Sequence, residues 1–149
     1  MIVREFRPED SEELYGIVLS SLDEQYEPTV FYYFHSQWPS GQLVVCDISG
    51  RPMGFLCSTK VGPNRARIMM FAVRSEYRNR GLGQLLLDRF RMNAMMNGMS
   101  TITLEVRPDN IRAIRFYKRN GFKETGVLPR FYKDGGDGIR MDGPTIMSN

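Results

Sequence analysis

One segment limits the fold of this chain more than any other: a short apolar run over residues 66–73 that leads through two glycines into an amphipathic helix. The run is too short for a buried helix and ends in polar residues, so it predicts a central strand. Apolar side chains then recur four residues apart from Leu82 to Phe90, and Gly98 stands where a helix C-cap belongs. Residues 100–106 alternate between apolar and polar, which predicts another strand. A strand, a helix and a strand in this order indicate a mixed α/β domain.

The segments on either side of this unit fit the same class. They predict strands over residues 2–6, 42–48, 52–61, 122–128 and 130–141, and helices over 9–22, 28–38 and from Asp109 or Asn110 to Asn120-Gly121. Ser49-Gly50 lies between two of these strands, so a hairpin is expected there, and the last two strands are expected around the turn Asp134-Gly135-Gly136-Asp137-Gly138. With 149 residues and no internal repeat, the chain is expected to form one domain over residues 1–149, of which 143–149 are a disordered tail.

Composition excludes several classes of protein. No apolar run approaches the ~18 residues of a transmembrane helix, and the first residues lack a secretory leader, so a cytoplasmic chain with no membrane partner is expected. Cys46 and Cys57 lack the spacing of a zinc site and His35 is the single histidine, so no metal is expected. Both cysteines fall in apolar, strand-like segments, which favours small buried side chains over redox groups.

The net charge of +3 is divided unevenly along the chain. Residues 1–50 hold two arginines against nine Asp or Glu, a net charge of −7, and the remainder carries +10. Sixteen of the twenty basic residues are arginine, whose planar guanidinium suits phosphate. A phosphate-bearing ligand, a nucleic acid and no specific ligand are all compatible with this bias.

The most informative motif is Arg78-Asn79-Arg80-Gly81-Leu82-Gly83, at the junction of the central strand and its helix. Its glycines let the backbone approach a ligand, the helix N-terminus offers unpaired N–H groups, and two arginines stand beside it. These features favour a pyrophosphate ligand over a solvated glycine turn. A P-loop would need Gly-Lys-Ser/Thr, which is absent, and the dinucleotide fingerprint would need a third glycine where Leu86 stands.

Three motifs follow one another between residues 78 and 122. Residues 78–83 fill the pattern Gln/Arg-x-x-Gly-x-Gly/Ala, residues 104–107 read Leu-Glu-Val-Arg and are followed by Asn110, and residues 113–122 end in a Tyr-x-x-x-Gly-Phe pattern. In these motifs the chain resembles the GNAT superfamily of acetyl-CoA-dependent N-acetyltransferases.

A narrower resemblance extends upstream and downstream. Residues 22–26 resemble the Leu-Pro-Glu-Asn-Tyr segment of protein N-terminal acetyltransferases, with Asp23 and Gln25 as departures, and residues 130–132 resemble their Asn-Tyr-Tyr. The chain is therefore similar both to the bacterial ribosomal-protein type and to the catalytic subunit of the archaeal and eukaryotic type.

This resemblance implies a GNAT-like α/β fold, in which a central mixed sheet is flanked by helices and two central strands splay apart. It also implies acetyl-CoA as cosubstrate in the gap between those strands. The implied cosubstrate-binding residues lie on the first splayed strand, the glycine segment and the following helix: Phe71, Ala72, Val73, Arg78, Asn79, Arg80, Gly81, Leu82, Gly83, Gln84, Asn110 and Tyr117.

Direct transfer in a ternary complex needs a neutral amine, a polarised thioester carbonyl and a proton for the departing thiolate. A backbone N–H near Val73 would polarise the carbonyl, and no Ser, Thr or Cys has an adjacent His that would make it a nucleophile. Glu105 is the first candidate base, because alternation takes it off the apolar face of its strand; a solvated carboxylate is the alternative. Glu24 is the second candidate, acting through water or by binding the substrate ammonium. Tyr117 matches the family's proton donor, and a packing role is its alternative.

The implied substrate is the free N-terminus of a protein or peptide. Glu24, Tyr26 and Tyr132 would line its groove and narrow access for an internal lysine. Because an α-amino pKa is about 7.7–8.0, roughly a quarter of the amine is neutral at pH 7.4, and a modest base suffices. The acidic first fifty residues suit a cationic peptide or a ribosomal surface, and a merely solvated acidic face is the alternative. A ribosome or an auxiliary subunit is a candidate partner.

Three other functions stay open from the sequence. A GNAT enzyme that acetylates a lysine side chain or a polyamine would share the cosubstrate motifs. An acyl-CoA sensor without turnover would share them too. A specific nucleic-acid binder is disfavoured, because few aromatic residues interleave with the basic stretch over residues 74–91.

Overall fold

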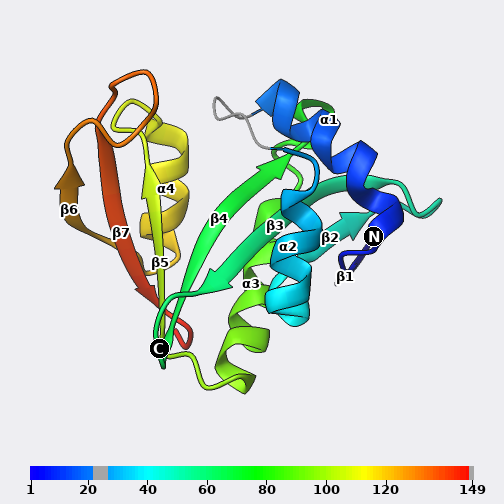
Figure 1. The fold of residues 1–149 in the computed structure, drawn as a ribbon, viewed down its shortest axis with the longest axis horizontal. Helices are drawn as coiled ribbons and strands as arrows, with labels where there is room; N and C mark the ends of the chain where they lie inside the picture. Colours follow the sequence, from blue (N-terminus) through cyan, green and yellow to red (C-terminus); the bar gives the residue numbers. More distant parts are fainter. Residues whose placement is uncertain (22–26, 148–149) are drawn as a thin grey trace.

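A seven-stranded mixed sheet carries the fold in the computed structural model, which describes residues 1–21 and 27–147 (Figure 1). The strands are β1 (Ile2–Glu5), β2 (Leu43–Cys46), β3 (Pro52–Lys60), β4 (Arg65–Val73), β5 (Thr101–Val106), β6 (Lys123–Leu128) and β7 (Gly138–Pro144). They lie in the order β1-β2-β3-β4-β5-β7-β6, with β4 and β5 parallel and the other five pairs antiparallel.

Helices cover the two faces of this sheet. They are α1 (Ser11–Ser21), α2 (Val30–Gln37), α3 (Leu82–Met96) and α4 (Ile111–Arg119), with single 3-10 turns at η1 (Pro8–Asp10), η2 (Pro39–Gly41) and η3 (Ser75–Tyr77). Apolar side chains of α1 and α2 pack with β2, β3 and the end of β4 in one core, whereas those of α3 and α4 pack with β5 in the other. The predicted mixed α/β sheet with flanking helices is confirmed.

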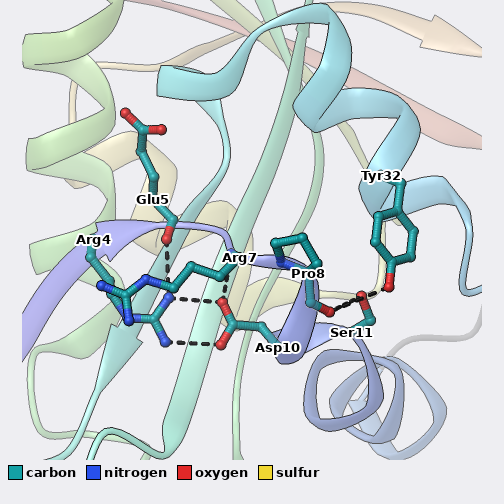
Figure 2. Close-up of polar contacts among 7 residues, drawn as sticks. All are labelled: Arg4, Glu5, Arg7, Pro8, Asp10, Ser11 and Tyr32. Carbon is teal, nitrogen blue, oxygen red and sulfur yellow. Dashed lines mark hydrogen bonds and ion pairs between the residues drawn. The ribbon is translucent and has the colours of Figure 1, made fainter.

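A buried carboxylate ties the first strand to the first helix (Figure 2). Asp10 accepts two hydrogen bonds of 2.8 Å from the Arg4 guanidinium and a third, also 2.8 Å, from the backbone N–H of Arg7. The hydroxyl of Tyr32 donates to the carbonyl of Pro8 at 3.3 Å, so α2 is attached to the same turn. A bidentate arginine pair that also meets a backbone donor satisfies the lone pairs that burial takes from water.

A β-bulge at Met69 shapes the centre of the sheet. Cys57 pairs with Met70 and Ser58 with Ile68, which leaves Met69 without an opposite residue on β3. Ile68 therefore belongs to the core under α3, while Met70 belongs to the core under α1 and α2. Since a bulge bends its strand and increases its twist, it turns the second half of β4 away from the neighbouring strand.

The strands β4 and β5 separate beyond this bulge, as Figure 1 shows. Their parallel pairing covers only Arg65–Arg67 of β4 and Thr101–Thr103 of β5. The splay predicted for the central strands is confirmed, and it opens a gap beside the end of β4.

Two predictions about the C-terminal part of the chain are wrong. The strand expected over residues 130–141 begins only at Gly138, because turns fill residues 130–136, where Arg130 and Gly135 have positive φ. The disordered tail expected from residue 143 is contradicted at its start, since β7 continues through Pro144 and the buried Thr145 hydroxyl donates to the Met99 carbonyl at 3.0 Å.

Two further sequence predictions, on a helix cap and on the cysteines, are confirmed. Asn110, rather than Asp109, caps α4, since its side chain accepts from the N–H of Ala113 at 3.3 Å. Cys46 and Cys57 are free and buried, as expected for small apolar side chains. No helix in the described part of the chain is long and apolar enough to span a membrane.

Candidate active site

A cavity of about 910 Å³ lies where β4 and β5 separate. Three walls enclose it: the end of β4, the segment that leads into α3, and one side of α4. The residues that line it are Phe71, Ala72, Val73, Tyr77, Arg78, Asn79, Gly81, Leu82, Gly83, Gln84, Asn110, Ile111, Arg112, Ala113, Arg115, Phe116, Tyr117 and Arg119.

The N-terminus of α3 opens into this cavity. The first backbone bond of the helix runs from Leu85 N–H to the Gly81 carbonyl, so the N–H groups of residues 82–84 have no acceptor within the helix. Gly81, the residue before the helix, has a φ of +79°. This left-handed backbone conformation is unfavourable for residues other than glycine. A Cβ on Gly83 would lie 3.8 Å from Phe71 and Phe116, both of which line the cavity. The segment therefore presents unpaired donors and exposed backbone to an anion.

The end of β4 presents backbone groups to the same gap. The N–H of Arg74 donates to the Met53 carbonyl on β3 at 2.8 Å. Because antiparallel pairs alternate between hydrogen-bonded and non-hydrogen-bonded, Val73 and Phe71 direct their N–H and C=O groups away from β3 and toward the gap. The guanidinium of Arg78 donates to the Val73 carbonyl at 3.3 Å, and the Val73 N–H faces the gap.

The cavity wall is cationic. Arg78, Arg112, Arg115 and Arg119 line it, and none of its lining residues is Asp or Glu. Arg112 also donates to the Asn79 side-chain oxygen at 2.8 Å, which links α4 to the segment before α3. The absence of lining carboxylates favours an anionic occupant.

Tyr117 lines the cavity from α4 and is surrounded by aromatic rings. Its ring centroid lies 5.5 Å from that of Phe116, 5.4 Å from Phe122 and 6.4 Å from Phe71. Burial, and secondly the charge of Tyr132, raise the pKa of the Tyr117 phenol well above its ordinary value. The phenol is therefore protonated at neutral pH, and Tyr132 lies near enough to influence it.

Glu105 lies on the face of β5 opposite to the apolar face that packs under α3 and α4, and it pairs with two arginines. The Arg67 guanidinium donates to Glu105 Oε1 from both Nε, at 2.8 Å, and Nη2. Arg140 Nη2 lies 3.8 Å from Oε2, which has no hydrogen-bond partner among the described residues. Only 6% of the Glu105 side chain is exposed, so the solvated-carboxylate interpretation is wrong.

The structure gathers most of the residues that the sequence singled out. Eleven of the twelve candidate cosubstrate residues line the one cavity; the exception is Arg80, whose guanidinium lies 5.6 Å from the Tyr77 ring centroid. Glu105 and Tyr132 do not line it. Glu24 and Tyr26 lie outside the described residues.

Sequence reasoning missed part of the wall that α4 provides. Arg112, Arg115, Phe116 and Arg119 line the cavity but were not singled out. The signal was present as arginines spaced three and four apart on a helix whose other face is apolar. Within the described residues, no group of three or more His, Cys, Asp or Glu gathers in a way that could hold a metal.

Comparison with known proteins shows to which family this chain belongs. The model of the Acetyltransferase (GNAT) family matches residues 8–122. The chain belongs to that family. It is an acetyltransferase that takes acetyl-CoA as its cosubstrate.

Three relatives of this acetyltransferase cover most of its length. N-alpha-acetyltransferase 30 of Schizosaccharomyces pombe is 33% identical over 128 residues, which cover 83% of this chain and 85% of the relative. The crystal structure of Ard1 from Thermoplasma volcanium has a TM-score of 0.93 at 36% identity and covers 98% of both chains. That of Chaetomium thermophilum Naa20 in complex with a bisubstrate analogue has a TM-score of 0.88 at 27% identity and covers 97% of this chain and 86% of its own.

Proposed function

We propose that this acetyltransferase transfers the acetyl group of acetyl-CoA to the α-amino group of protein or peptide N-termini. The observation that carries the proposal is the likeness, over 83% of the chain, to a relative named as an N-alpha-acetyltransferase. The gap between β4 and β5, with a cationic wall on one side and a buried carboxylate nearby, supports it chemically.

The cavity residues fit acetyl-CoA as occupant. The free N–H groups of residues 82–84 and the side chain of Arg78 would hold the diphosphate, and Asn110 would reach the pantetheine or acetyl end. The open edge of β4, at Phe71 and Val73, would pair with the amides of the pantetheine arm. Bound acetyl-CoA supplies the activated acetyl group.

The protein's own groups would support direct attack by the amine on the thioester carbonyl. The Val73 N–H faces the gap and would donate to the carbonyl oxygen as negative charge develops there. Glu105, through Oε2, which has no hydrogen-bond partner among the described residues, would accept the proton that the amine loses, directly or through water. Tyr117, kept protonated by burial, would give its proton to the departing sulfur and recover one from solvent.

The loop between β6 and β7 would form one wall of the peptide groove. The guanidinium of Arg107 lies 4.0 Å from the Tyr132 ring centroid and pairs with Asp134 at 3.1 Å, which fixes the loop against the end of β5. Tyr132, near Tyr117, would then contact the substrate backbone. Glu24 and Tyr26, which lie outside the described residues, would contact the substrate as the family resemblance implies.

A peptide panel tests the proposal. Acetyl-CoA-dependent thiol release is measured with a short peptide that has a free α-amine, the same peptide blocked at its N-terminus but carrying a free lysine, and spermidine. Release with the free α-amine alone is the expected result. Release only with the blocked peptide or spermidine would identify a lysine or polyamine enzyme, and no release despite acetyl-CoA binding would favour a sensor or a missing partner subunit.

A further inference from the structure

We propose that Arg115 and Arg119 form an anion subsite on α4 that binds the 3′-phosphate of CoA and makes this enzyme select CoA over its dephosphorylated form. This inference rests on the proposed function only in that CoA occupies the cavity beside α4. It concerns two residues within the segment 113–122 to which the sequence motifs give no role, since the Tyr-x-x-x-Gly-Phe pattern specifies only Tyr117, Gly121 and Phe122.

The geometry of α4 places these arginines on one side of the helix. Arg112, Arg115 and Arg119 are spaced three and four residues apart, so they share a face, and all three line the cavity. The opposite face carries Ile114, which is buried in the core under α3. At a rise of about 1.5 Å per residue, Arg115 and Arg119 lie about 6 Å apart along the axis, close enough for both to contact one phosphate with their long side chains.

Contacts along its length fix α4 against the segment that would hold the diphosphate. The Asn120 amide donates to the Gln84 side-chain oxygen at 3.1 Å and accepts from the Gln84 amide at 2.8 Å. The buried Arg91 donates to the Asn120 carbonyl as well. Together with the bond from Arg112 to Asn79, these contacts hold both ends of α4, so Arg115 and Arg119 stand at a fixed place beside the α3 N-terminus.

The charges near the cavity exceed what a diphosphate needs. The two negative charges of the diphosphate are matched by Arg78, Arg112 and a helix N-terminus worth about half a positive charge. Arg115 and Arg119 add two more, and neither makes an ion pair or hydrogen bond with any residue of the described ranges 1–21 and 27–147. A phosphate monoester carries about −1.5 to −2 at neutral pH, which matches this surplus.

Lysine 118 on the same helix provides the matched control. Lys118 is absent from the cavity wall and pairs with Glu124 at 3.6 Å on the outer side of α4. Changing it removes one positive charge from the same helix without touching the proposed subsite. A long-range charge effect and a direct contact are thereby separated.

Isothermal titration of the full-length protein with CoA and with 3′-dephospho-CoA tests the proposal without reference to turnover. Wild type is expected to bind CoA at least about tenfold more tightly, because hydrogen bonds to a charged group contribute about 1.5–3 kcal/mol. In Arg115→Gln/Arg119→Gln the affinity for CoA should fall to that for dephospho-CoA. Arg115→Lys/Arg119→Lys should retain part of the preference, and Lys118→Gln should retain it fully.

Several outcomes would overturn the subsite. Equal affinity of wild type for the two nucleotides would remove it, and so would a double glutamine variant that weakens both equally or a Lys118→Gln variant that loses the preference. If wild type binds neither compound, the placement of CoA in this cavity, on which the proposed function also rests, fails. That result is distinguishable from loss of selectivity alone.

Discussion

At the scale of single residues, Glu105 is the group whose replacement should separate chemistry from cosubstrate binding. Glu105→Gln keeps an oxygen that accepts from Arg67 but removes the carboxylate that would take the amine proton. We expect kcat to fall by about a hundredfold, at the low end for general bases because part of an α-amine is already neutral. The rate of thiol release at saturating substrate gives kcat. Titration with CoA should give an unchanged dissociation constant.

An exposed carboxylate serves as the control for this prediction. Glu124 on β6 is half exposed and pairs only loosely, at 3.6 Å, with Lys118. Glu124→Gln should leave kcat unchanged. If Glu105→Gln kept the wild-type kcat, the base would have to be another group, with Glu24 the second candidate.

Tyr117 allows a prediction that combines kinetics with stability. Burial raises the pKa of its phenol above the ordinary value of about 10, so the folded state holds the proton at a pH where the unfolded chain has lost it. This contribution to the free energy of unfolding is complete below pH 10 and declines as pH rises further. Tyr117→Phe should therefore lose less stability than wild type between pH 9 and 11 in urea unfolding, while its kcat at pH 8 falls.

Two results with Tyr117→Phe would contradict this prediction. Parallel stability curves for Tyr117→Phe and wild type above pH 10 would mean that the phenol titrates normally and is not held protonated by the fold. An unchanged kcat would leave Tyr117 as a packing residue of the aromatic group around Phe116 and Phe122.

Residue patterns in the sequence predicted on which face of an element a side chain lies, but not which residues that side chain contacts. Alternation alone placed Glu105 off the apolar face of its strand, and the structure confirms that placement. Its partner Arg67 is 38 positions away, on a strand that becomes a neighbour only through the parallel crossover of α3. No local period encodes such a pairing. The spacing of Arg115 and Arg119 showed that they share a helix face, but only the packing of α4 against the segment before α3 places that face at the cavity.

At the scale of elements, the glycines on either side of α3 allow two equivalent substitutions to be compared. Gly81 before the helix and Gly98 after it have φ of +79° and +83°, and both would place a Cβ in open space. Alanine should cost each site a similar free energy of folding, about 1–2 kcal/mol, because the strain is alike. Only Gly81→Ala should weaken CoA binding, since the N–H groups that follow it line the cavity. Thermal unfolding and titration of both variants measure this, and equal CoA affinity in the two would argue against the α3 N-terminus as the anion site.

Elements were predicted well where their hydrophobic period was long, and less well where geometry depends on one residue. The periods over α3 and β5 gave both elements within a few residues of their ends. The bulge at Met69 could not be read, because Ile68, Met69 and Met70 are all apolar and side-chain polarity does not show which one is unpaired. The turn over residues 134–138 was visible as Asp and Gly residues, but the chain has already left the extended conformation at Arg130, whose positive φ its residue type does not signal.

At the scale of the whole molecule, one sheet joins two cores, and the buried cysteines report whether they open together. Cys46 and Cys57 lie in the core under α1 and α2, and burial raises the pKa of both thiols. The cavity lies against the other core, and β2, β3 and β4 contribute side chains to both cores. If the domain unfolds as one unit, acetyl-CoA at a hundred times its dissociation constant should slow alkylation of both thiols about a hundredfold, since it adds about 2.7 kcal/mol to the unfolding free energy. Acetyl-CoA suits this experiment because its sulfur is in a thioester and does not react with the alkylating reagent. Mass spectrometry with the single variants Cys46→Ala and Cys57→Ala assigns each thiol.

An alkylation rate that acetyl-CoA leaves unchanged would contradict the prediction. It would mean that the layer of α1 and α2 opens on its own while the cavity stays intact.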